Sequence, residues 1–164
     1  MSVLYRIREL LDANNVKYTI IIHSPAFTAQ EIASSSFVSG KELAKTVILN
    51  VNGDVVMAVI PAHKRLFIPG IKKYFEIDDV SLATESEFSN IFSECKTGAM
   101  PPFGNLYDMK TYICKDFEKQ RYIVFNAGNH RELIKMKYSS YEKLVMTKVI
   151  PLPLESLNYF CPFI

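Results

Sequence analysis

Apolar and polar residues along the first sixty positions follow two different periods. Apolar residues at steps of three and four predict an amphipathic helix over 2–14. The run over 18–23 is β-branched and apolar, which predicts a buried strand. Two further apolar runs, 43–51 and 54–60, are joined by Asn52-Gly53. An Asn-Gly pair supplies the positive φ angles of a type I′ turn, so these two runs are predicted to form a β-hairpin.

The rest of the sequence alternates between helical and extended patterns. Capping boxes at Thr28 with Glu31 and at Ser139 with Glu142 each predict the start of a helix. The predicted helices cover 28–35, 69–75, 85–92 and 139–146, and the predicted strands cover 111–114, 122–126 and 132–136. Because strands occur both in a hairpin and between helices, we expect an α+β fold with a mixed, mostly antiparallel sheet surrounded by helices.

Composition narrows the function classes. The 164 residues are 49% hydrophobic and 22% charged, which fits one globular domain and excludes a disordered chain. The net charge of +2 is too small to hold a nucleic acid by charge alone. No apolar run reaches the ~18 residues of a membrane span and the first residues lack a signal-peptide layout, so we expect a cytoplasmic protein without a membrane partner. The three cysteines, Cys95, Cys114 and Cys161, and the three histidines show neither disulfide nor metal-ligand spacing. No P-loop or dinucleotide motif is present, so no metal or cofactor is expected.

Lys45 is the first candidate for chemistry. Alternate residues of a strand share a face, so Lys45 is predicted to lie with Val47, Leu49 and Val51 on an apolar face. A lysine there is costly unless it has a partner or a function. The alternative is that Lys45 begins the strand and extends its ammonium group to water.

The segment from Gly98 to Gly104 is the second candidate. Two glycines and two prolines in seven residues predict a stiff loop, with the N–H groups of Ala99 and Met100 free to bind an anion or oxyanion. The alternative is an ordinary tight connection. At Gly128 to His130, a turn between two strands is predicted to present a carbonyl group and His130 to a cavity, or simply to hold a structural histidine.

Charged pairs at Lys64-Arg65 and Lys72-Lys73, with Tyr74 and Phe75 nearby, form a further candidate. They indicate either a solvated surface or a patch that contacts a phosphate backbone.

Taken in order, five segments resemble the YbaK-like aminoacyl-tRNA deacylases, a family related to the editing domain inserted in bacterial prolyl-tRNA synthetases. The resemblance covers residues 1–150, which it implies are a single editing domain, and leaves the tail 151–164 outside the pattern. Cys114-Lys115-Asp116 departs from the Leu-Asp that the family usually has at that strand end. The five segments are His23-Ser-Pro, 28–33, 42–47, 98–104 and 127–130.

The resemblance implies a metal-independent hydrolase that acts in trans on mischarged tRNA, typically alanyl- or cysteinyl-tRNA for proline. It implies that Lys45, Gly98 and His130 are the catalytic residues. The implied substrate-binding residues are Ala99, Met100, Pro101, Pro102, Phe103, Gly104, Gly128, Asn129, His23, Phe27 and Val47.

The expected partner is the 3′ acceptor end of an aminoacyl-tRNA, with prolyl-tRNA synthetase or an elongation factor as a second partner. In this hypothesis, Lys45 holds the substrate, the N–H groups of Ala99 and Met100 stabilise the oxyanion, Gly98 positions water and His130 shapes the pocket. His23, Phe27 and Val47 would form a wall that excludes larger side chains. Two alternatives stay open: a module that binds aminoacyl-tRNA or a synthetase without turnover, and an amino-acid sensor that uses the same pocket.

Overall fold

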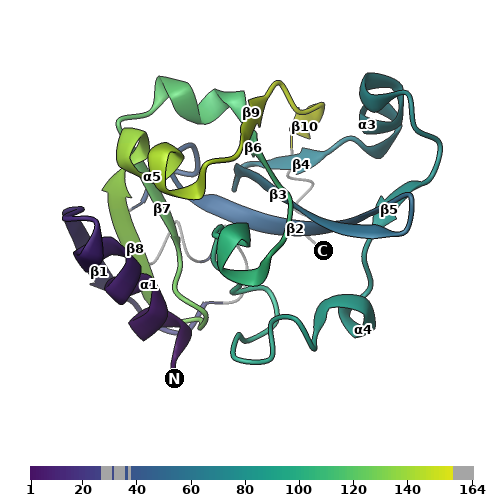
Figure 1. Cartoon of the computed structure of the whole chain (residues 1–164). Coiled ribbons are helices and arrows are strands. Elements are labelled where there is room, and N and C mark those ends of the chain that lie inside the picture. The colour runs from purple at the N-terminus through teal and green to yellow at the C-terminus, as the bar shows by residue number, and fades with distance from the viewer. Residues whose placement is uncertain (27–30, 32–35, 37, 157–164) are drawn as a thin grey trace, which may run out of the picture.

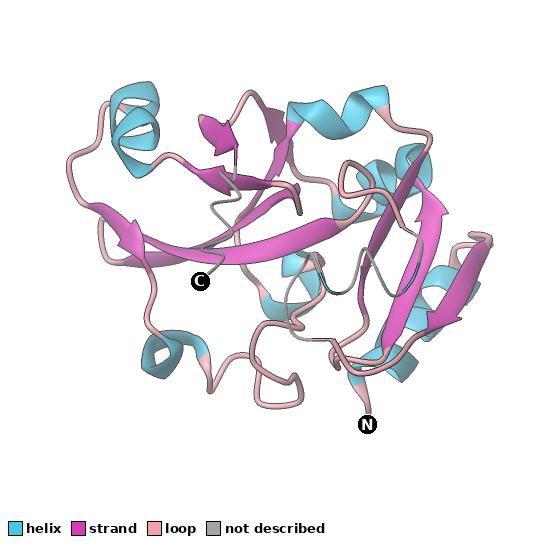
Figure 2. Ribbon diagram, turned by 180° about the vertical axis from the view of Figure 1, so that it is seen from behind, coloured by secondary structure: helices cyan, strands magenta, loops and turns pink. Residues whose placement is uncertain are grey.

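A long antiparallel hairpin forms the centre of the molecule, which we describe from a computed structural model over residues 1–26, 31, 36 and 38–156. The hairpin joins β2 (Ala44–Val51) to β3 (Asp54–Pro61), in a register that pairs Lys45 with Ile60 and Val51 with Asp54. Asn52 and Gly53 have φ angles of 50° and 83°, so the predicted turn is confirmed. Seen from behind in Figure 2, the hairpin crosses most of the width of the molecule.

The hairpin belongs to a five-stranded sheet of order β5-β2-β3-β6-β9. The added strands are β5 (Val80–Leu82), β6 (Thr111–Cys114) and β9 (Lys148–Ile150). β6 runs parallel to β3 and to β9, whereas the remaining strand pairs of the described residues are antiparallel. The predicted mixed, mostly antiparallel sheet is therefore confirmed.

A second, three-stranded antiparallel sheet has the order β1-β8-β7. Its strands are β1 (Tyr18–Ile22), β8 (Glu132–Lys137) and β7 (Tyr122–Asn126). A parallel bridge between Leu43, which precedes β2, and Val124 of β7 connects the two sheets. In Figure 1, α1, β1 and β8 lie on one side of the molecule, and β5 and α3 lie on the other.

Helices surround these sheets, as the sequence predicts. They are α1 (Val3–Ala13), α3 (Ile68–Phe75), α4 (Glu85–Phe88) and α5 (Tyr138–Val145), with 3₁₀ helices η1 (Gly104–Tyr107) and η2 (Lys115–Lys119). Ser2 caps α1, which buries Val3, Ile7 and Leu11 against the core. None of the described helices is long and apolar enough to cross a membrane.

Several local predictions are wrong. β1 lies at a sheet edge, so it is only half-buried and Ile22 is 77% exposed. The helix predicted over 85–92 begins with a capping box of Thr84 and Glu87 but ends at Phe88. Hydrogen-bonded turns take its place from there. The capping box at Ser139 does not form, because α5 begins one residue earlier, after Lys137. The helix predicted over 28–35 falls almost entirely outside the described residues.

Short strands after Pro61 and Pro151 have no clear signal in the sequence. β4 (Lys64–Leu66) pairs with β10 (Leu154–Ser156), and Leu152 is buried beneath them. The chain beyond residue 150 is thus joined to the sheet region up to Ser156. Three-residue strands carry too few residues for a period of two to be recognised.

Candidate functional site

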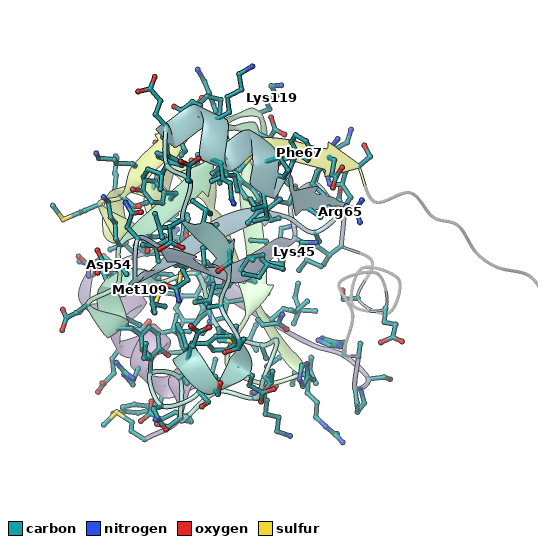
Figure 3. All side chains as sticks on the ribbon, turned by 90° about the vertical axis from the view of Figure 1, so that its right-hand side faces the viewer. Lys45, Asp54, Arg65, Phe67, Met109 and Lys119 are labelled. Atoms are coloured by element: carbon teal, nitrogen blue, oxygen red, sulfur yellow. The ribbon has the colours of Figure 1, made fainter. Side chains whose placement is uncertain are left out.

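Lys45 is the second residue of β2, at the end of the hairpin opposite Asp54 (Figure 3). Its side chain is half-buried, and this burial lowers the pKa of its ammonium group below the usual value. Within the described residues, Lys45 has no hydrogen-bond or ion-pair partner. A partly desolvated and unpaired cation is able to bind an anionic or carbonyl oxygen of a ligand.

Lys45 shares its side of the strand with Leu43 and Val47, as the alternation predicts. Leu43 packs in a small apolar cluster with Val124 and Leu133, which belong to the three-stranded sheet. One face is therefore continuous from Lys45 across the bridge to that sheet. Val47, a predicted wall residue, is half-buried on this face.

His23 follows β1 at the same face, because residues 21 and 23 point to one side of the strand and Ile21 contacts the Leu43 cluster. The imidazole is buried, and its Nδ1 lies 2.6 Å from the carbonyl oxygen of Ser24. A carbonyl oxygen only accepts, so Nδ1 carries the proton and neutral His23 has its lone pair on Nε2. Within the described residues, Nε2 has no hydrogen-bond partner.

The loop at Gly98 and the β7–β8 turn at His130 are in direct contact. Nε2 of His130 lies 3.0 Å from the carbonyl oxygen of Thr97. Gly98 has a φ angle of 80°, and a Cβ built on it would lie 3.8 Å from Cε1 of His130. Two backbone hydrogen bonds, from Lys96 N to Gly128 O and from Gly128 N to Ala99 O, complete the connection.

The prediction that the N–H of Ala99 is free is wrong. This N–H donates to the carbonyl oxygen of Lys96 at 2.9 Å and closes a turn. Because this N–H is already engaged, it is not available to a substrate. The N–H of Met100 has no acceptor within the described residues, and the same is true of Gly98. Gly98 is the exposed residue of this loop.

The following residues of the loop, Pro101 to Gly104, are all buried. The Phe103 ring packs edge-on against Phe125 and Tyr141. The hydroxyl of Tyr141 donates to the carbonyl oxygen of Pro102 at 2.5 Å. These contacts indicate that Pro101, Pro102, Phe103 and Gly104 hold the loop in position from behind. The aromatic side chain of Tyr141 was not predicted as part of this region, because its position on α5 gives no signal for it.

The β7–β8 turn has two residues with structural roles. A Cβ on Gly128, where φ is 89°, would lie 2.6 Å from Cβ of Val3, so Gly128 allows α1 to pack closely. Asn129 Oδ1 accepts from the N–H groups of Arg131 and Glu132. The turn borders a groove of about 640 Å³. Its lining residues are Ile22, Pro25, Lys96, Asn129, His130, Arg131 and Glu132.

The candidate residues thus form two groups. Gly98 and His130 are in contact. The segment that carries His23 is held beside them by two backbone hydrogen bonds, from His23 N to Arg131 O and from Ala26 N to His130 O. Lys45 and Val47 lie on the face that His23 also shares. Within the described part of the chain, no hydrogen bond joins Lys45 to the Gly98–His130 group. Phe27 lies outside the described residues.

The two cysteines of the described residues are not activated nucleophiles. Burial raises the pKa of the Cys114 thiol to about 11, and burial also raises that of Cys95, so neither is a ready thiolate at neutral pH. Both are free thiols. Among the described residues, no three His, Cys, Asp or Glu side chains gather as a metal site.

Comparisons with known proteins agree with this architecture. A proline–tRNA ligase of Staphylococcus saprophyticus is 31% identical over 101 residues, which are 62% of this chain and 18% of that enzyme. One from Staphylococcus aureus strain Newman is 34% identical over 90 residues, 54% of this chain and 15% of the enzyme. The chain therefore spans less than a fifth of these relatives.

Two solved structures share the fold. The "hypothetical protein APE2540" has a TM-score of 0.79 and 23% identity, with 92% of this chain and 99% of that chain covered. A candidate trans-editing enzyme for prolyl-tRNA synthetase has a TM-score of 0.77 and 16% identity, with 93% and 98% covered. The model of the aminoacyl-tRNA editing domain family matches residues 23–144, which hold all of the candidate residues described above. The chain belongs to the aminoacyl-tRNA editing domain family.

Proposed function

We propose that this protein is a trans-editing hydrolase that removes the amino acid from mischarged tRNA, with alanyl- or cysteinyl-tRNA for proline as the substrate. Membership of the editing family and similarity to part of proline–tRNA ligases support this proposal. The observation that carries it is the state of Lys45. A partly buried lysine that has no partner among the described residues is costly to the fold, and substrate binding supplies an interaction for it.

The reaction is hydrolysis of an ester that is already activated. A water oxygen adds to the carbonyl carbon, the bond to the ribose oxygen breaks, and that oxygen leaves with a proton. Lys45 holds an oxygen of the substrate and fixes its orientation. The N–H of Met100 replaces Ala99 as donor to the oxyanion, and Gly98 lets the backbone approach closely.

His23 has a larger role in this proposal than that of a pocket wall. Its lone pair on Nε2 accepts a proton from the attacking water, while the contact of Nδ1 with Ser24 fixes the tautomer. His130 keeps its Nε2 engaged with Thr97, so it positions the loop instead of exchanging protons. No step in this scheme needs a metal ion, and a chelator tests this directly.

Specificity is proposed to be steric. A missing methylene changes binding by only ~1–3 kcal/mol, so a pocket rejects a larger side chain far more easily than a smaller one. Val47 lies beside Lys45 on the same face and is a suitable wall residue. A pocket of this kind accepts alanine and excludes the correct amino acid, proline.

A deacylation panel tests the proposal. Purified protein is mixed with alanyl-, cysteinyl-, seryl- and prolyl-tRNA for proline, with and without a chelator, beside the Lys45→Ala variant. We expect release from one small-side-chain species, unchanged by the chelator and strongly reduced in Lys45→Ala. Folded protein that releases none of the four amino acids would contradict the proposal. Binding without release would instead favour a non-catalytic aminoacyl-tRNA binding module.

A further inference from the structure

Basic side chains from distant parts of the sequence meet around the end of the three-stranded sheet where β8 leads into α5. Lys135 and Lys137 alternate along β8 on the same side as Leu133, which packs against Leu43. Lys137 pairs with Tyr122 of β7, and directly paired residues share a face. The basic residues therefore lie on the same continuous face as Lys45.

Tyr122 is surrounded by cations on this face. Nζ of Lys135 lies 4.6 Å from the centre of its ring, and Cζ of Arg121 lies 5.3 Å from it. Such contacts hold both cations beside the ring without neutralising them. Lys135 also forms an ion pair of 3.9 Å with Glu42, so only part of its charge is available to a ligand.

Lys137 is the last residue of β8 and also lines a groove of about 540 Å³ between the end of α1 and α5. Lys17, Lys137 and Lys143 line it together with Asn14, Asn15 and Ser140, and no acidic residue is among the described lining residues. These lysines form no ion pair within the described part of the chain. Three unpaired lysines around one groove repel one another, and an anionic ligand removes that cost.

The basic residues Lys64, Arg65, Lys72 and Lys73 have less positive charge available to bind an anion. Arg65 forms an ion pair of 2.7 Å with Glu155, and Lys64 donates to the hydroxyl of Ser156. Lys72 and Lys73 lie in the last turn of α3, where the helix dipole favours cations. The pairing of β4 with β10 brings Glu155 and Ser156 beside Arg65 and Lys64, so these two cations already have partners within the protein.

We propose that the basic region at this end of the three-stranded sheet, made up of Lys17, Arg121, Lys135, Lys137 and Lys143, binds the phosphate backbone of an RNA duplex. This inference rests on the proposed function, in which the duplex is the acceptor stem of the substrate. The 3′ end then reaches Lys45 and His23 along the same face. Phosphate contacts of this kind position the substrate without reading its sequence. A local basic face also explains how a chain with a net charge of only +2 binds a polyanion.

The test measures binding of an uncharged RNA hairpin that contains an acceptor-stem duplex, by fluorescence anisotropy between about 50 and 200 mM salt. The variant Lys17→Ser/Lys137→Ser is compared with Lys72→Ser/Lys73→Ser, which removes the same charge from α3. We expect about tenfold weaker binding for the first pair, and a salt slope smaller by about 1.5. The α3 pair is expected to bind as the unchanged protein does. Equal binding by both pairs, or no binding by the unchanged protein, would overturn the inference.

A second measurement separates this inference from the proposed function. Hydrolysis is followed on full mischarged tRNA and on an aminoacyl ester of adenosine, which has no duplex. The Lys17→Ser/Lys137→Ser variant is expected to have a higher KM on tRNA and an unchanged rate on the adenosine ester. If the unchanged protein hydrolyses neither substrate but binds the hairpin through these lysines, the hydrolase proposal fails and the binding face stands. A rate on the adenosine ester that falls with the variant would contradict a role confined to the duplex.

Discussion

Nε2 of His130 lies 3.0 Å from the carbonyl oxygen of Thr97, and this contact fixes the loop that carries Gly98 against the β7–β8 turn. A carbonyl oxygen only accepts, so Nε2 carries the proton in this contact. His130 is buried, which protects the hydrogen bond from water. The geometry makes His130 a positioning residue for the candidate oxyanion site.

Substitution of His130 tests that positioning role. The amide of glutamine places a donor near the position of Nε2, whereas alanine has none. We expect His130→Ala to lower kcat about 10-fold or more and to lower the free energy of unfolding by about 1 kcal/mol. His130→Gln is expected to recover most of both. Rates and urea denaturation check this, and a glutamine variant as slow as the alanine variant would indicate direct proton transfer by His130.

His23 is expected to behave differently, because Nε2 is its nitrogen without a hydrogen-bond partner among the described residues. In His23→Asn, the amide nitrogen takes the place of Nδ1 and keeps the contact with Ser24, but the acceptor at Nε2 is lost. We expect kcat to fall about 10²-fold with little change in KM or in stability. Steady-state kinetics on mischarged tRNA measure this. A fall of less than about twofold would mean that the tRNA or the solvent takes the proton.

Lys45 is expected to increase the rate of hydrolysis while lowering the free energy of unfolding. Methionine fills nearly the same space without a charge, so Lys45→Met is expected to reduce hydrolysis about 10- to 100-fold while leaving the free energy of unfolding equal or higher. Burial lowers the pKa of Lys45 in the folded state. Between that pKa and the usual value near 10.5, the unfolded chain binds more protons, so the stability of the unchanged protein rises with pH relative to the variant. Denaturation at several pH values checks the sign, and a stability gap that widens with pH would contradict it.

The sequence predicts the hairpin, α1 and the two strands β7 and β8 because each has a strong local signal. Asn52-Gly53 dictates one turn type, and the apolar spacing of α1 matches one face of a helix. The three-residue strands β4, β5, β9 and β10 and the length of α4 depend on tertiary contacts instead. β10, for example, exists because its backbone pairs with β4, about ninety residues earlier in the chain.

The site, too, could be predicted from the sequence only where a local pattern decides the structure. Alternation correctly placed Lys45 with Val47, since this needs only the strand period. It could not show that the N–H of Ala99 is occupied, because the loop conformation decides that. Nor could it show that Tyr141 supports Pro102 from α5, since those two residues meet only through the packing of the core.

Tyr141→Phe tests the support behind the loop. The Tyr141 side chain is fully buried and burial raises its pKa well above the usual value, so its hydroxyl stays protonated and donates to Pro102. Removing the hydroxyl leaves a buried carbonyl oxygen without a donor, which costs about 1–3 kcal/mol. We expect that loss in urea denaturation, together with a lower kcat on mischarged tRNA. Lower stability with an unchanged kcat would show that the loop keeps its position without this bond.

Alanine substitutions at Gly98 and Gly104 are expected to have different effects, on activity at Gly98 and on stability at Gly104. A Cβ on Gly104 would lie 2.6 Å from the carbonyl oxygen of Met109 and closer still to the Thr111 hydroxyl, so Gly104→Ala is expected to destabilise the fold by about 3 kcal/mol. Among the described residues, the nearest atom to a Cβ on Gly98 is 3.8 Å away, so the φ of 80° is what resists alanine there, at about 1–2 kcal/mol. Because Gly98 is exposed beside His130, we expect Gly98→Ala to lose most hydrolysis while it stays folded. Denaturation and kinetics on both variants decide this, and a fully active Gly98→Ala would remove Gly98 from the site.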